Sequence, residues 1–423
     1  MPTPASAASA LAPSAAASAP LWTLEGLRAA DPVLGLALLM LAAVVIAETL
    51  HRTWRLPRIC GHMLTGALAS PLMLQLLDRF ELDPWKPLID LAIGALVFEL
   101  GTRIRLRWLI DNPWLALSCV LQAGLCGLLV TIGLVWMGAP LVTAAVAGIV
   151  ALSTSPVIVL AVTHESRSRG QVTERLLLMA ALNSVVAVVG LKVLRVVLAS
   201  SPEGGGGDEV LQAVISALRV ISGSLLLGLA FGFALDRLSP LVRGTPAMPV
   251  LQIALVIAAS LLAVQWTLSP LLALLVAGMA ARTRMSHGLV VEPHLGSAGA
   301  VLNVLLFICL GLLFTVEGLR TLWPWVLVIV LMRLLGTSLA VGALARHSAL
   351  GWRQAGALVL ALQPMSSLAV LLAADTFGWT SQLPGVHKET LQALLLAVTL
   401  MQLTGPIWTQ LSLRYVARET NPG

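Results

Sequence analysis

Two short stretches of this sequence place a proline and several hydroxyl or amide side chains inside long apolar runs. These residues are Ser153, Thr154, Ser155 and Pro156 in the first stretch, and Gln363, Pro364, Ser366 and Ser367 in the second. Proline removes a backbone donor and frees an earlier carbonyl group. In hydrocarbon, hydroxyl groups, water or neighbouring helices must satisfy such freed groups. Each stretch therefore predicts either a kinked helix or a broken helix that lines a binding site.

The second stretch lies seven apolar runs after the first, so the two predicted helices run in opposite directions. Transporters built from inverted repeats carry broken helices at corresponding positions of their two halves, with the substrate between them. The pair of breaks therefore favours a binding site over two simple kinks. The candidates for binding an ion or a solute in these stretches are Thr154, Ser155, Gln363, Ser366 and Ser367, with Pro156 and Pro364 as the helix breaks.

Three further polar residues lie deep in apolar runs. Asn183 and Ser184 stand near the middle of one run, and Arg333 stands near the middle of another. Arginine keeps its charge in proteins, so Arg333 must face protein, water, an anion or free carbonyl groups. Small polar side chains also join neighbouring membrane helices. For Asn183 and Ser184 a packing role and a binding role therefore both stay open.

Acidic residues are rare inside the apolar runs, and none lies at mid-depth. Glu48 and Glu99 lie near the ends that face the loop arginines, where we expect them to pair with those arginines, and Asp90 lies near an opposite end. The four cysteines fall in or beside apolar runs and are expected to be small buried side chains. No His or Cys cluster has the spacing of a metal site. We therefore expect neither a metal nor a cofactor, and no enzyme chemistry.

The elements that carry these residues are predicted to be membrane-spanning helices. Of 423 residues, 58% are hydrophobic and 11% are charged, whereas a soluble domain carries about 25% charged residues. A transmembrane helix needs roughly 20 apolar residues. Thirteen runs fit this description, at about residues 33–50, 59–77, 86–103, 113–136, 140–163, 174–198, 212–234, 247–265, 268–282, 297–316, 322–345, 354–374 and 390–412. We predict an all-α polytopic membrane protein.

The loops predict the orientation. Seventeen of the 26 Lys and Arg residues follow odd-numbered runs or lie in the C-terminal segment, five lie on the other side and four lie inside runs. Cytoplasmic loops carry the excess of basic residues, so the N-terminus is predicted outside and the C-terminus in the cytoplasm. The net charge of +6 reflects this loop bias, and we expect no nucleic-acid partner. Residues 1–30 read as a disordered Ala/Ser/Pro-rich tail with a short interfacial helix, and 416–423 as a short cytoplasmic tail.

Several segments together resemble the monovalent cation:proton antiporter superfamily, of the sodium/proton exchanger type. They are residues 55–68 (RLPRICGHMLTGAL), residues 91–101 (LAIGALVFELG), the 153–156 stretch, Arg333 and the broken twelfth run. The resemblance implies that residues 31–415 form one exchanger-like transmembrane domain. A core of runs 113–198 and 322–412 would move like an elevator against a dimerisation part of runs 33–103 and 212–316. It also implies a homodimer that transports Na+, K+ and H+ across a bilayer, expected to be a bacterial inner membrane.

The chain departs from this family where acids are usual. The resemblance implies carboxylates at the positions of Ser155, Ala180 and Ser184, and in some relatives at Ser366 or Ser367. Antiport requires a group that ionises to bind the cation and takes up a proton to release it. Three hypotheses follow. Asp90 or Glu99 supplies the titrating acid of a cation antiporter; or the chain transports an anion or polar solute with Arg333 as counter-charge; or it is a non-transporting, regulatory homologue.

Overall fold

The computed structural model describes residues 32–70, 86–104, 111–199, 207–242, 245, 247–284, 296–312, 319–366 and 388–419. The predicted N-terminal tail with its interfacial helix, the second half of the twelfth run with Ser367, and residues 420–423 lie outside the described residues. Within the described ranges the chain is helical. An isolated antiparallel β-bridge joins Thr154 and Met365.

Every one of the thirteen predicted runs contains at least one helix. The helices are α2 (Pro32–Trp54), α3 (Arg58–Ala69), α4 (Lys86–Arg103), α6 (Pro113–Trp136), α7 (Leu141–Leu152), α8 (Pro156–Glu165), α9 (Gln171–Ala199), α10 (Gly207–Leu238), α11 (Ala247–Gln265), α12 (Pro270–Arg284), α13 (Gly296–Leu312), α14 (Leu319–Leu344), α15 (Trp352–Ala361) and α17 (Lys388–Leu411). A short 3-10 turn, η2 (Ser239–Leu241), follows α10, and a π-helical segment, η3 (Ser412–Ala417), continues α17.

Seven of the described helices are long and apolar enough, by length and composition, to cross a membrane. They lie in α2, α6, α9, α10, α11, α14 and α17. Their outer faces carry large exposed apolar side chains, for example Leu41 on α2, Val120 on α6 and Leu226 on α10. A soluble protein does not expose so many large apolar residues, so these faces fit a lipid environment. The count of thirteen spans and the orientation of the termini stay predictions.

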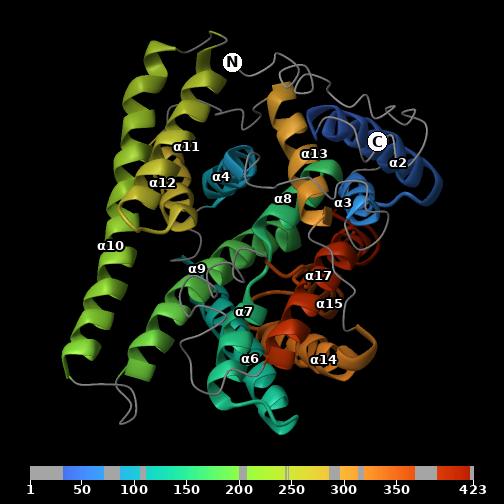
Figure 1. The fold of residues 1–423 in the computed structure, drawn as a ribbon, viewed down its shortest axis with the longest axis vertical. Coiled ribbons are helices and arrows are strands. Elements are labelled where there is room, and N and C mark those ends of the chain that lie inside the picture. The colour runs from blue at the N-terminus through green and yellow to red at the C-terminus, as the bar shows by residue number, and fades with distance from the viewer. Residues whose placement is uncertain are drawn as a thin grey trace, which may run out of the picture.

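The helices pack in two groups (Figure 1). The flanking group contains α2, α3, α4, α10, α11, α12 and α13, and the crossover group contains α6, α7, α8, α9, α14, α15 and α17. In Figure 1, α10, α11 and α12 stand side by side at the left, whereas α6, α7 and α14 gather at the lower end. The division into domains that the family resemblance implies stays a prediction. That the two groups are a moving core and a dimerisation domain stays a prediction.

Glycines allow helices of the flanking group to touch backbone to backbone. A Cβ atom at Gly101 of α4 would overlap the carbonyl oxygen of Leu275, and one at Gly278 of α12 would overlap that of Phe98. Membrane helices use small residues in this way because lipid supplies little drive for helices to associate, so close van der Waals contact must do so. Helices α4 and α12 of the flanking group are therefore closely packed. Helices α8 and α9 contact this group through α4.

Candidate functional site

The helix break predicted at residues 153–156 is present. Helix α7 ends at Leu152 and α8 begins at Pro156, where the missing proline N–H costs nothing because first-turn amides have no helical partner. Ser155 is the N-cap of α8, and its hydroxyl oxygen accepts a bond from the Ile158 N–H at 3.4 Å. The residues between the helices are extended, which exposes their backbone groups to other partners.

Those partners come from the second predicted break. Helix α15 ends at Ala361, and the residues after it run antiparallel to the first break, with a bridge between Thr154 and Met365. The Ser155 N–H donates to the carbonyl of Pro364 at 2.8 Å. Two interrupted segments that are about 200 residues apart in sequence thus meet in one crossover. We call the residues at this meeting point the crossover site.

Thr154 is the hub of the crossover site. Its hydroxyl group donates to the Leu362 carbonyl at 3.1 Å and accepts bonds from Asn183 Nδ2 at 3.2 Å and Arg333 Nη2 at 3.2 Å. A hydroxyl group offers one proton and two lone pairs, so this one is fully used. Thr154 is completely buried. The sequence analysis predicted a polar cluster here, and the structure joins residues from α7–α8, α9, α14 and α15.

Arg333 faces free carbonyl groups, one of the four environments that its burial allowed. Its guanidinium group donates to the Ala151 carbonyl at the end of α7 and to the Leu362 carbonyl, 2.7 Å away, at the end of α15. Helix C-termini carry about half a negative charge each, so two of them offset the arginine charge. These contacts offset part of the positive charge that the anion-transport hypothesis assigns to Arg333 as counter-charge. Both Nη groups are engaged, and the buried Nε atom has no hydrogen-bond partner among the described residues.

Asn183 carries a buried oxygen atom that lacks a protein partner. Because Thr154 already gives its proton to Leu362, the hydroxyl group must accept from the Asn183 amide, which fixes Nδ2 toward Thr154. The Oδ1 atom therefore points away from Thr154, and it has no hydrogen-bond partner in the described part of the chain. Buried acceptors are normally satisfied. Ser184, one residue later, shares its hydroxyl proton between the carbonyls of Thr154 and Ala180, at 3.3 and 3.1 Å.

The remaining predicted site residues lie in different places. Gln363 is buried at the crossover but donates to the Val359 carbonyl of its own helix at 2.8 Å, and Ser366 is buried close by in sequence. Ser367 lies outside the described residues. Asp90 is exposed on α4. Gln363 is therefore buried at the crossover, but its described hydrogen bond stays within residues 359–363 and does not join the two breaks.

Glu99 lies at the far end of α8 from the crossover site. Its carboxylate contacts His164 Nε2 at 2.9 Å, and His164 is nine residues after the Ser155 cap, about 14 Å along the helix axis. The structure thus does not bring Glu99 to the crossover site. The expected pairing of Glu48 with loop arginines is confirmed, with Arg52 at 2.8 Å and Arg58 at 3.0 Å.

Sequence reasoning missed two acids that hold this architecture. Glu165, at the end of α8, contacts the beginning of α3. Glu419, near the C-terminus, accepts bonds from the N–H groups of Val172 and Thr173 at the beginning of α9, at 2.7 and 2.8 Å. Residues 416–419 of the predicted tail are therefore packed against α9 in this structure. No local pattern pairs residues that lie more than a hundred positions apart, so only the fold could reveal these contacts.

Broken helices that cross beside a buried arginine, in a bundle with lipid-compatible faces, define the class of secondary transporters. The profile of the family described as "Sodium/hydrogen exchanger, transmembrane" matches residues 37–414. The chain therefore belongs to the sodium/hydrogen exchanger family. A comparison with curated proteins finds no match.

Solved structures of similar fold include two of the sodium proton antiporter MjNhaP1 from Methanocaldococcus jannaschii. The structure at pH 8 is 16% identical, with a TM-score of 0.66, and the match covers 91% of this chain and 98% of that chain. The structure from an electron-microscopy map is 15% identical, with a TM-score of 0.69, and the match covers 93% and 100%. At this identity the likeness shows a shared fold.

Proposed function

We propose that this protein is a secondary transporter that exchanges a monovalent cation, Na+ or K+, for protons across the cytoplasmic membrane. In this proposal the crossover group moves in an elevator-like step against the flanking group, which forms a homodimer. Membership of the sodium/hydrogen exchanger family over residues 37–414 supports the reaction class. The same fold in a sodium proton antiporter supports it further.

The observation that carries the proposal is the unpartnered Oδ1 atom of Asn183 at the crossover. An oxygen atom that is buried without a donor is costly in a folded protein, and a monovalent cation would satisfy it. The hydroxyl groups of Ser155 and Ser184 lie in the same polypeptide crossing and offer further neutral oxygens. Neutral oxygens suffice for a monovalent ion, as the carbonyl-lined filters of potassium channels show. The offset of the Arg333 charge by two helix ends lowers the repulsion that such an ion would meet.

If neutral oxygen atoms bind the cation, a different group must bind the proton. Threonine, serine and asparagine do not titrate in the physiological range, so an acid elsewhere must take up the proton. Asp90 and Glu99 are the acids that the sequence analysis singled out for this role. Of the two, Glu99 is the stronger candidate, because its side chain is only 13% exposed and it lies between the two helix groups.

The proposal is tested by proton flux in proteoliposomes that contain a pH-sensitive dye. Addition of NaCl or KCl to the wild-type protein should change the internal pH between about pH 6 and 9. Asn183→Leu should abolish the response, because it removes the free oxygen. Thr399→Val is the matched control: Thr399 is partly exposed on α17 and bonds only within its own helix in the described contacts. A folded wild-type protein that responds to no monovalent cation would refute the proposal and favour the non-transporting homologue.

A further inference from the structure

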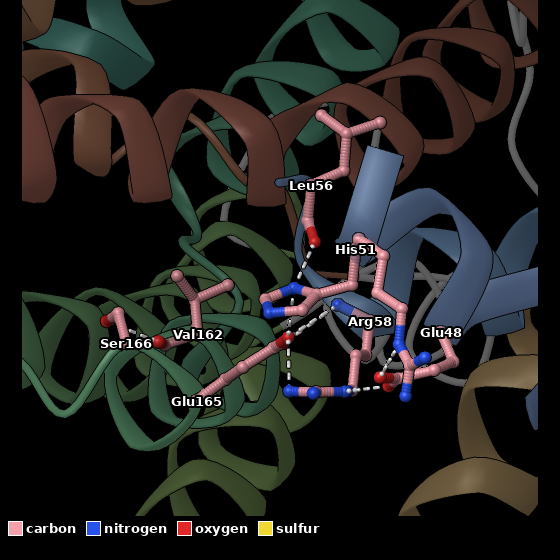
Figure 2. Close-up of polar contacts among 8 residues, drawn as sticks. Glu48, His51, Leu56, Arg58, Val162, Glu165 and Ser166 are labelled. Carbon is pink, nitrogen blue, oxygen red and sulfur yellow. Dashed lines mark hydrogen bonds and ion pairs between the residues drawn. The ribbon is translucent and has the colours of Figure 1, made fainter. Parts of the chain in front are cut away.

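The last two residues of α8 join the crossover group to the flanking group. Figure 2 shows the first contact, in which Glu165 of α8 points toward the beginning of α3. Both of its carboxylate oxygens accept from the backbone N–H of Arg58, at 2.8 and 2.9 Å, and Arg58 Nη1 lies 3.4 Å from Oε1. The Glu165 side chain is 11% exposed. A carboxylate that is buried this deeply is held in place by its partners.

Glu165 supplies the cap that α3 lacks in its own sequence. The first amides of a helix have no helical partner, and the residue before α3 is Pro57, which provides no side-chain cap. The cap of a flanking helix therefore comes from the crossover group. The N-terminal dipole of α3 adds to the attraction for the carboxylate. If α8 moves along the flanking group, α3 loses its cap.

The surroundings of this contact hold Arg58 on the flanking side. Arg58 Nε bonds Glu48 of α2 at 3.0 Å, and Glu48 also bonds Arg52 (Figure 2). His51 of α2 approaches Glu165 with Nδ1, at 3.4 Å, while the same atom lies 2.8 Å from the Leu56 carbonyl. Arg58 and His51 thus stay with α2 and α3 when Glu165 leaves. Within this cluster, the bonds that cross between the groups are those of Glu165.

A second contact lies one residue earlier on α8. His164 Nε2 is 2.9 Å from a carboxylate oxygen of Glu99 on α4, and these side chains are 28% and 13% exposed. Two consecutive residues of α8 therefore contact two flanking helices, α3 and α4. The opposite end of α8 is the Ser155 cap at the crossover site. A helix of ten residues is about 15 Å long and moves as one rod, so displacement of the crossover site must displace His164 and Glu165.

We propose that His164 and Glu165 form a latch that closes one state of the transport cycle, and that both contacts must open each time the crossover group moves. This proposal rests on the proposed function, because it assigns the latch to the motion of that transporter. In the latched state, Glu165 caps α3 and His164 holds Glu99. In the unlatched state, the Arg58 amide is open to water and the contact between His164 and Glu99 is broken.

The test is hydrogen–deuterium exchange of peptides that cover residues 57–63, in proteoliposomes. One sample contains the transported cation on both sides, so that the carrier cycles, and the other contains choline chloride. Because the Arg58 N–H has no helical acceptor, its protection reports the Glu165 contact. We expect the cation to accelerate exchange at Arg58 by about tenfold or more, while amides deeper in α3 keep their protection. Glu165→Gln keeps one acceptor oxygen but loses the charge, so its Arg58 amide should exchange faster than that of the wild type in both samples.

Glu48→Gln is the matched control. Glu48 also bonds Arg58, but it lies on α2 within the flanking group, so this variant should show the wild-type response to the cation. For the second contact, His164→Gln should alter the transport rate.

The outcomes separate the latch from the proposed function. A dye response to the cation, together with exchange at Arg58 that is equal in both samples, would overturn the latch and leave the transporter proposal standing. Absence of any dye response in folded protein would overturn both proposals. If Glu165→Gln does not fold, the wild-type comparison between cation and choline still decides the question.

Discussion

At the scale of single residues, Thr154 links the two broken segments. One hydroxyl group ties the end of α15, the side chain of Asn183 on α9 and the Arg333 guanidinium group on α14. Without the hydroxyl group, the buried Asn183 Nδ2 would lose its described partner, whereas Arg333 and the Leu362 carbonyl would each lose one of several bonds. The cost of a buried polar group without a partner exceeds the gain from a typical bond. Thr154 therefore matters more for stability than an average membrane threonine.

Thr154→Val keeps the shape of the side chain and removes its hydroxyl group. We expect a loss of about 1–3 kcal/mol in the free energy of unfolding, mainly because the buried Asn183 amide is left unsatisfied. Thr154→Ser should retain most of the stability. The measurement is thermal unfolding in detergent, compared with Thr399→Val at a partly exposed position of α17. Equal melting temperatures for the two valine variants would contradict the role of Thr154 as a hub.

At the scale of elements, the crossover depends on how closely α17 approaches α15. Gly405 of α17 faces Pro364, and a Cβ atom there would lie 2.8 Å from the Pro364 Cα atom. Thr409, one turn later, donates to the Ala361 carbonyl at 3.1 Å, which satisfies one of the last carbonyls of α15. Helix α17 therefore packs directly against the second break.

Gly405→Ala should push α17 away from the break. We expect a destabilisation of about 1–3 kcal/mol, because overpacking a close contact forces backbone shifts, together with a reduced transport rate. Gly356→Ala on α15 is the matched control, since no atom lies within 4 Å of the added Cβ. That variant should be neutral or more stable, as alanine favours a helix over glycine by roughly 0.5–1 kcal/mol. Similar melting temperatures for both variants would contradict the close approach.

At the scale of the whole molecule, the two helix groups meet where α8, α9 and α17 contact α3, α4 and α10. One end of α8 lies at the crossover site and the other at the contacts of Glu165 and His164. The molecule therefore couples a buried polar site to an interface between its groups through one rigid helix. This coupling makes the protein suited to alternating access, in which a site is exposed to each side in turn.

The intactness of the exchanger scaffold can be tested by restoring acids to the crossover. Ser155→Asp combined with Ser184→Asp places carboxylates beside Thr154 and within the field of Arg333. We expect a cation-dependent rise in melting temperature, because a bound ligand stabilises by about 2.7 kcal/mol at a hundred times its dissociation constant. Thermal shifts in NaCl, KCl and choline chloride measure this. Identical shifts in all three salts would show that the crossover does not form a cation site.

Much of this protein was determined by its sequence. The apolar runs predict the helices because every backbone group in a membrane must be bonded within its own segment. The proline and hydroxyl residues at 153–156 predict the break between α7 and α8 because proline cannot continue the bonding of a helix. Arg333 was predicted to need a partner because arginine stays charged when buried. Each of these rules depends on one residue or on its neighbours in the sequence, so the amino-acid sequence alone is enough to apply it.

Only the tertiary structure decided which partners meet. Whether Arg333 faces an anion or two helix ends depends on the crossing of α7 and α15, which no local pattern encodes. The same holds for Glu165, which caps a helix that begins more than a hundred residues earlier. Charged and polar groups of this kind bond whatever the packing of apolar faces brings within reach, and in a membrane many packings satisfy the same apolar pattern. Which polar groups bond to each other is therefore decided by the tertiary fold.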